Sequence, residues 1–157
     1  MVDETNVENT MAAEDERNRT PETWDELKGS MPVLENLPDM VQPHEFTVAQ
    51  SGVFAITVTR VNDIMGSLKR MGWFDKNPPA SLKRKQTDVI RLVSEANVTC
   101  DTLFSMLARD AGVYSEWTKG RETFTMFFAY VTVLRWMEGE LGKSDSSKTR
   151  RNNAASK

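Results

Sequence analysis

The apolar residues of this chain recur every three or four positions through its middle and become scarce at both ends. Residues 1–19 and 143–157 hold few large apolar side chains, so neither segment can bury enough surface to offset the entropy cost of ordering. In the middle, the spacing places apolar side chains along one side of an α-helix. We therefore expect an all-α protein with a compact bundle of about four core helices over residues 46–142, a disordered acidic segment at 1–19 and a disordered basic tail at 143–157.

Residues 20–45 form a separate arm before the core. Thr20, Pro21 and Gly29 are typical of a short capped helix, and the prolines that follow prevent a long one. The apolar side chains are too few for the arm to be stable alone, so it needs a surface on its own core or on a neighbour. The partner-binding residues that we predict in the arm are Trp24, Leu27, Val33, Leu34 and Leu37.

The first core helix is expected to begin after Thr47, which matches a capping box with Gln50. Residues 52–61 are rich in β-branched side chains and also alternate in polarity, so a strand is the alternative there. We favour the helix because the apolar stripe continues and no second strand of similar quality exists to pair with. The stripe consists of Phe54, Val58, Val61, Met65 and Leu68.

Three further helices complete the predicted core. Two of them span residues 81–97 and 99–112, each beginning at a hydroxyl residue that can cap it. A connection follows over residues 113–120. The last helix covers about residues 121–141 and is apolar on two faces, which is typical of the central helix of a bundle. In the helices predicted at residues 81–97 and 99–112, the side chains expected to face the core are Leu82, Val89, Ile90, Val93, Leu103, Phe104, Met106 and Leu107.

The sequence offers few groups for catalysis. His44, the only histidine, lies in the proline-rich arm, which favours an exposed or docking role. Cys100, the only cysteine, falls in the first turn of a predicted helix, whose dipole lowers a thiol pKa, but the adjacent Asp101 favours a structural cysteine. Glycine-rich phosphate loops, EF-hands and multi-cysteine metal sites are absent. We predict no catalytic residues, cofactor, metal or small-molecule substrate; an enzyme of unrecognised type is the least favoured reading.

Charge is distributed unevenly. Residues 1–44 hold 11 acidic and 3 basic residues, whereas residues 45–157 hold 12 acidic and 17 basic residues. This split is compatible with an anionic partner for the core, or with an acidic segment that only adds solubility. The sequence shows neither a secretory signal nor an apolar run long enough for a bilayer, so we expect an intracellular, soluble protein or a virion component without membrane contact.

Basic and aromatic residues gather around one predicted helix–loop–helix corner. Lysine and arginine neutralise phosphates, and a loop Trp or Phe can stack on a base, so we predict nucleic-acid binding here. The alternative is a solvated face, or one for an acidic protein, in which Arg84 pairs with Asp88 and Trp73 and Phe74 cap the core. The predicted nucleic-acid-binding residues are Lys69, Arg70, Trp73, Lys76, Lys83, Arg84, Lys85 and Arg91.

Two functions follow from these features. The first is a non-enzymatic assembly protein that forms a homo-oligomer through its arm and contacts nucleic acid through the basic corner; its layout is similar to that of small virion or nucleocapsid proteins in architecture alone. The second is a monomeric adaptor or regulatory protein that binds an acidic protein partner. In that case the acidic arm folds over the basic corner and is autoinhibitory.

Overall fold

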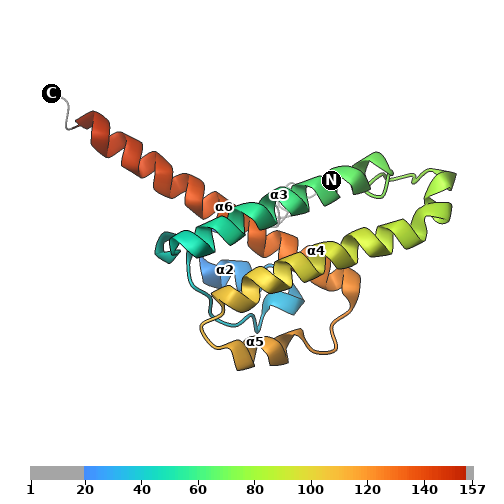
Figure 1. The fold of residues 1–157 in the computed structure, drawn as a ribbon, viewed down its shortest axis with the longest axis horizontal. Coiled ribbons are helices and arrows are strands. Elements are labelled where there is room, and N and C mark those ends of the chain that lie inside the picture. The colour runs from blue at the N-terminus through green and yellow to red at the C-terminus, as the bar shows by residue number, and fades with distance from the viewer. Residues whose placement is uncertain (1–19, 155–157) are drawn as a thin grey trace, which may run out of the picture.

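The computed structural model describes residues 20–154, with side chains to residue 143, and every regular element in this range is helical. The prediction of an all-α bundle is confirmed, because the described residues contain no strand. Figure 1 shows the arrangement. The elements are α2 (Trp24–Gly29), η1 (Pro32–Leu34), η2 (Pro43–Glu45), α3 (Val48–Arg70), η3 (Ala80–Lys85), α4 (Gln86–Leu107), α5 (Ala111–Thr118) and α6 (Thr123–Ala154).

Helix α3 begins at the predicted capping box. The Thr47 hydroxyl accepts from the Gln50 amide at 3.2 Å, and the Gln50 side chain accepts from the Thr47 amide at 2.9 Å. The helix then runs through residues 52–61, so the strand alternative is wrong there. Its buried face is rotated slightly from the predicted stripe: Val58 and Met65 are only partly buried. The buried residues are Phe54, Thr57, Val61, Ile64 and Leu68.

Helix α4 is one continuous helix where we expected two. Neither of the predicted boundary residues interrupts it. The Thr99 hydroxyl donates to the Glu95 carbonyl at 2.8 Å within the helix, and the side-chain amide of Asn97 donates to the Thr123 carbonyl at 2.9 Å. The buried stripe passes across the predicted break through Ala96 and Cys100, and this packing outweighs the local cap signals.

The start and end of this region also differ from the prediction. Residues 80–85 form the 3₁₀ helix η3, and α4 begins only at Gln86. Helix α4 ends at Leu107 rather than at residue 112, because the Asp110 carboxylate caps a new helix by accepting from the amides of Gly112 and Val113. The predicted connection at 113–120 is therefore mostly helix α5. Ile90 and Met106, predicted inward, are 51 % and 43 % exposed.

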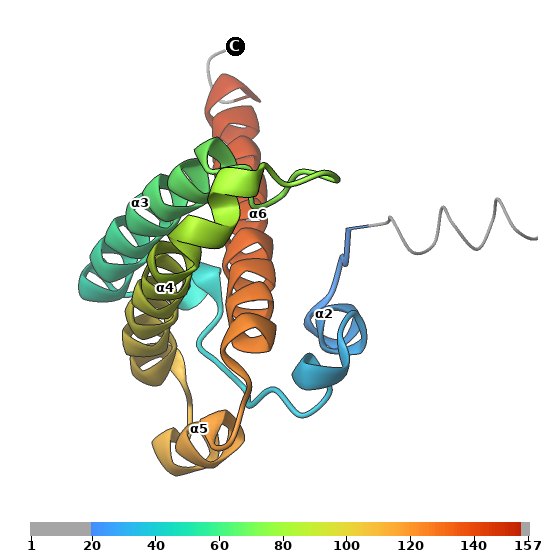
Figure 2. The ribbon, with the colours of Figure 1, turned by 90° about the vertical axis from the view of Figure 1, so that its right-hand side faces the viewer.

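Helix α6 lies between the α3–α4 hairpin and α2, as Figure 2 shows. Both of its predicted apolar faces are buried. Met126, Tyr130 and Met137 pack in the larger core cluster, which includes the arm, while Phe127 packs in a second core cluster near the far ends of α3 and α4. The second core cluster consists of Ile64, Leu68, Val89, Val93, Ala96 and Phe127. Its backbone is helical to Ala154, beyond the expected end near residue 141 and through most of the segment predicted to be a disordered tail. The C-terminal part projects away from the bundle (Figure 1). The disorder predicted for residues 1–19 lies outside the described range.

Candidate functional site

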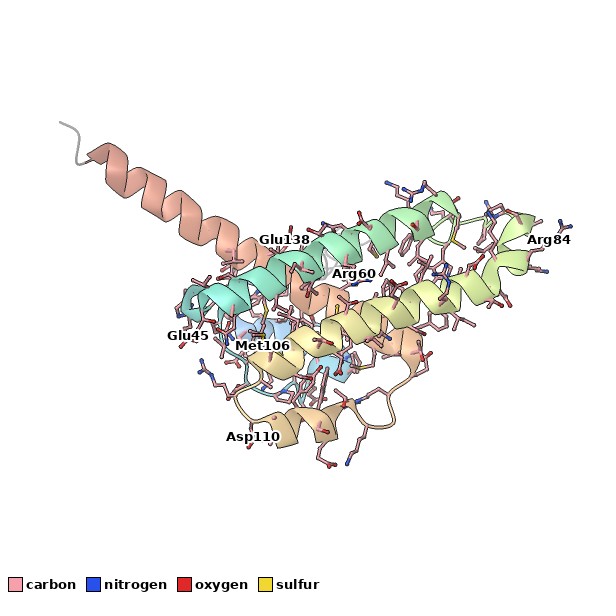
Figure 3. All side chains as sticks on the ribbon, in the orientation of Figure 1. Glu45, Arg60, Arg84, Met106, Asp110 and Glu138 are labelled. Atoms are coloured by element: carbon pink, nitrogen blue, oxygen red, sulfur yellow. The ribbon has the colours of Figure 1, made fainter. Side chains whose placement is uncertain are left out.

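The hairpin tip, residues 69–85, joins the end of α3 to the start of α4 and carries most of the predicted nucleic-acid-binding residues. It contains six basic residues and one acidic residue, a net charge of +5. Figure 3 shows side-chain nitrogen atoms at this end of the hairpin, where Arg84 is labelled. The six cations are all exposed, and they are Lys69, Arg70, Lys76, Lys83, Arg84 and Lys85.

None of these six cations forms an ion pair within residues 20–143. Arg70 donates to the Ser67 hydroxyl at 3.0 Å, which leaves its charge uncompensated. Most cations elsewhere in residues 20–143 are paired with carboxylates, and Lys28 and Arg121 are the exceptions. The paired cations are Arg60, Arg91, Arg109, Lys119, Arg135 and Lys143. Unpaired charge is therefore concentrated at the hairpin tip.

Arg91 differs from the other predicted nucleic-acid-binding cations. Its guanidinium lies 3.8 Å from the carboxylates of both Asp88 and Glu95, and Glu95 also lies 3.6 Å from Arg60. These acids offset its charge on the outer surface of the hairpin. The pair between Arg84 and Asp88, which belonged to the solvated-face alternative, is not formed, and Asp88 lies 3.8 Å from Arg91.

Trp73 caps the second core cluster instead of presenting a free ring. Its ring centroid lies 5.8 Å from those of Phe124 and Phe127, and the Phe128 ring stacks on it at 5.7 Å with an interplanar angle of 11°. Trp73 is partly buried in these contacts. Its role is therefore to hold the loop against α6, which is the core-capping alternative.

Two phenyl rings beside Trp73 remain accessible. Phe74 is 43 % exposed and Phe128 is 44 % exposed. Sequence reasoning placed Phe74 in the loop but missed Phe128. A signal was present: Phe128 falls outside both apolar stripes of the last helix, and an aromatic residue at such a position must face away from the helix's own core contacts.

The arm anchors lie in the protein's own core. Leu27 and Leu34 are 0 % exposed, Val33 and Leu37 are also buried, and all four belong to the same cluster as residues of α3, α4 and α6. Trp24 is partly buried, with its ring 5.5 Å from that of Trp136. Two surfaces were considered for the arm, its own core or a neighbour. In this structure the arm packs against its own core.

Polar contacts also attach the arm. The Trp117 indole donates to the Val33 carbonyl at 3.1 Å, and the Val41 amide donates to the Leu107 carbonyl at 2.8 Å. The Arg109 guanidinium donates to the Glu45 carboxylate at 2.6 Å. The backbone amide of Gln42 and the Arg109 guanidinium together hold the pKa of Glu45 below its ordinary value. The α2 cap is Thr23, rather than the expected Thr20.

The two side chains considered for catalysis, His44 and Cys100, lie in contrasting surroundings. His44 is exposed in η2. Cys100 is 1 % exposed, and burial, followed by the charge of Asp101, raises the pKa of its thiol to about 12, which leaves it protonated near neutral pH. These observations fit the structural role favoured for Cys100.

A buried polar cluster joins α4, α5 and α6. The hydroxyls of Tyr114 and Tyr130 lie 2.8 Å from each other and 2.9 and 3.2 Å, respectively, from Asp101 Oδ1. Each hydroxyl has one proton, so one tyrosine can donate to the other while the second donates to Asp101. Burial raises the pKa of both tyrosines well above the ordinary value, so both stay neutral. The cluster fixes three helices together, and neither tyrosine supplies a phenolate.

Among the described residues, no group of three or more metal-binding side chains converges, and no helix combines the length and apolar character needed to cross a bilayer. Comparison with protein-family models, curated proteins and solved structures finds no significant match.

Proposed function

We propose that this chain is a non-enzymatic nucleic-acid-binding protein whose contact surface is the hairpin tip. The observation that carries the proposal is the concentration of six exposed cations, without ion pairs in the described residues, at one end of the hairpin. Unpaired cations of this kind can neutralise phosphates and release the counterions condensed on a nucleic acid.

A titration of labelled DNA and RNA tests the proposal. Replacing three tip cations together (Lys83→Gln, Arg84→Gln and Lys85→Gln) is expected to lower the affinity at least about tenfold at low salt, because three phosphate contacts are lost. The matched control makes the same change in net charge at cations away from the tip (Lys28→Gln, Lys119→Gln and Arg135→Gln). Equal losses in the two triple variants would contradict a localised site.

Arm-mediated assembly is a second candidate, supported by the distribution of the arm's contacts. Its hydrogen bonds and ion pair join residues 107–109, 117 and 136, all distant in the sequence. An arm from a second copy can make the same contacts if the connection at residues 42–47 opens, which is the geometry of domain swapping. A virion-type component would use this exchange to join subunits.

Light scattering across a wide range of protein concentration tests arm exchange. A mass that rises from monomer to dimer or larger oligomer as the concentration increases would support the exchange. A wild-type protein that stays monomeric at every concentration would contradict it. Deletion of residues 20–45 is unsuitable, because it would expose apolar core residues such as Leu103 and Leu107.

A further inference from the structure

Two accessible phenyl rings pack against the indole of Trp73 at the hairpin tip. The Phe74 centroid lies 4.9 Å from that of Trp73, with the rings inclined by 62°, and the Phe128 centroid lies 5.7 Å from it. Phe74 comes from the loop and Phe128 comes from α6, so the pair brings together two distant parts of the sequence. We call Trp73, Phe74 and Phe128 the aromatic platform.

The aromatic platform is held in place from below and from the side. Below it, Phe124 and buried Phe127 of α6 pack against Trp73. At the side, the loop turns at Gly72, whose φ is +80°, and a Cβ at this position would lie 2.6 Å from the Cδ of Pro79. The turn therefore requires glycine and fixes the direction in which Trp73 and Phe74 leave α3.

Cations adjoin the aromatic platform along the chain. Lys69 and Arg70 close the last turn of α3 just before it, and Lys76 follows Phe74 by two residues. The loop projects on the side of α6 where α2 lies (Figure 2). Exposed flat rings next to unpaired cations combine the two contacts that single-stranded nucleic acid uses, stacking for its bases and charge for its phosphates.

We infer that the hairpin tip binds single-stranded nucleic acid in preference to a duplex, with unpaired bases stacking on Phe74 and Phe128. This inference rests on the proposed function and specifies its ligand. In a duplex the base faces are covered by neighbouring bases, so stacking on the two phenyl rings adds no affinity for a duplex. In a single strand the faces are free, and stacking on aromatic side chains adds to phosphate neutralisation without requiring a particular sequence.

Fluorescence anisotropy with two probes tests the inference. The probes are an oligothymidine of about 16 nucleotides, near the upper site size of single-strand-binding modules, and a DNA duplex of the same length. The variants are Phe74→Leu and Phe128→Leu, which keep apolar bulk but remove the flat ring. Ile56→Ala, at a 64 % exposed position on α3, is the control. Thermal unfolding confirms that each variant is folded.

The wild-type protein is expected to bind oligothymidine more tightly than duplex at equal salt. Each leucine variant should lower the oligothymidine affinity at least about fivefold and leave the duplex affinity unchanged. The Ile56→Ala control should bind both probes as the wild-type protein does. Equal wild-type affinity for both probes, with no effect of either leucine variant, would overturn the stacking inference and leave the proposed function standing. Binding to neither probe would overturn both.

Vesicles of phosphatidylcholine and phosphatidylserine separate stacking from insertion into an anionic lipid surface. Leucine is as apolar as phenylalanine, so both variants would keep their affinity for a bilayer. Vesicle binding that survives in the leucine variants, together with unchanged oligothymidine affinity, would assign the aromatic platform to lipid and overturn the inference. Loss of oligothymidine affinity without vesicle binding would support it.

Discussion

At the scale of single residues, Trp117 links the arm to the rest of the protein through one buried hydrogen bond. The residue is 6 % exposed, and its indole N–H donates to the Val33 carbonyl at 3.1 Å. Trp117→Phe would leave this carbonyl buried without its donor, so we expect the free energy of unfolding to fall by about 1–3 kcal/mol. Urea denaturation measures the change. Trp136→Phe, which removes a less buried bond to the Pro21 carbonyl, should cost less, and the opposite order would contradict this account.

At the scale of elements, α4 shows where a cap signal depends on its surroundings. Asp110 caps α5 through two amides, whereas Thr99 lies inside α4 and donates to Glu95. We expect Asp110→Ala to lower the free energy of unfolding by about 0.5–2 kcal/mol. Thr99→Ala should change it by less than about 0.5 kcal/mol, since the hydroxyl bond inside a helix contributes little. Chemical denaturation compares the two, and a larger loss for Thr99→Ala would contradict a continuous α4.

The sequence predicted the elements whose signals agree with one another. At Thr47 and Gln50 the capping box and the apolar stripe indicate the same helix, and the structure contains it. At Thr99 a local cap signal opposed a continuous apolar stripe, and tertiary packing of Cys100 and Leu103 decided the outcome. The apolar periodicity also could not predict the aromatic platform of Trp73, Phe74 and Phe128. The platform depends on how a loop packs against a helix about 50 residues later in the sequence.

At the scale of the whole molecule, the arm, residues 20–45, packs on the core, and its carboxylates do not pair with the cations of the hairpin tip. Residues 1–19 hold six acidic and two basic residues, so we expect electrostatic competition for the tip to come mainly from this segment. This limits the autoinhibition proposal to the acidic segment.

Removal of residues 1–19 tests that proposal. If the acidic segment competes with nucleic acid, the shortened protein should bind oligothymidine more tightly at low salt. The difference should disappear at high salt, because screening shortens the reach of surface charge to about 3 Å at 1 M. Titration of both proteins at two salt concentrations measures the effect. Identical affinities at low salt would refute competition by this segment.

The salt dependence of binding tests the central claim, nucleic-acid contact through the hairpin tip, most directly. The logarithm of the binding constant for oligothymidine is plotted against the logarithm of salt concentration for the wild-type protein and the variant with Lys83→Gln, Arg84→Gln and Lys85→Gln. We predict that the variant's slope is shallower by about two units, since each phosphate contact on a single strand contributes about 0.7. An unchanged slope would show that these three cations do not meet phosphates and would contradict the account.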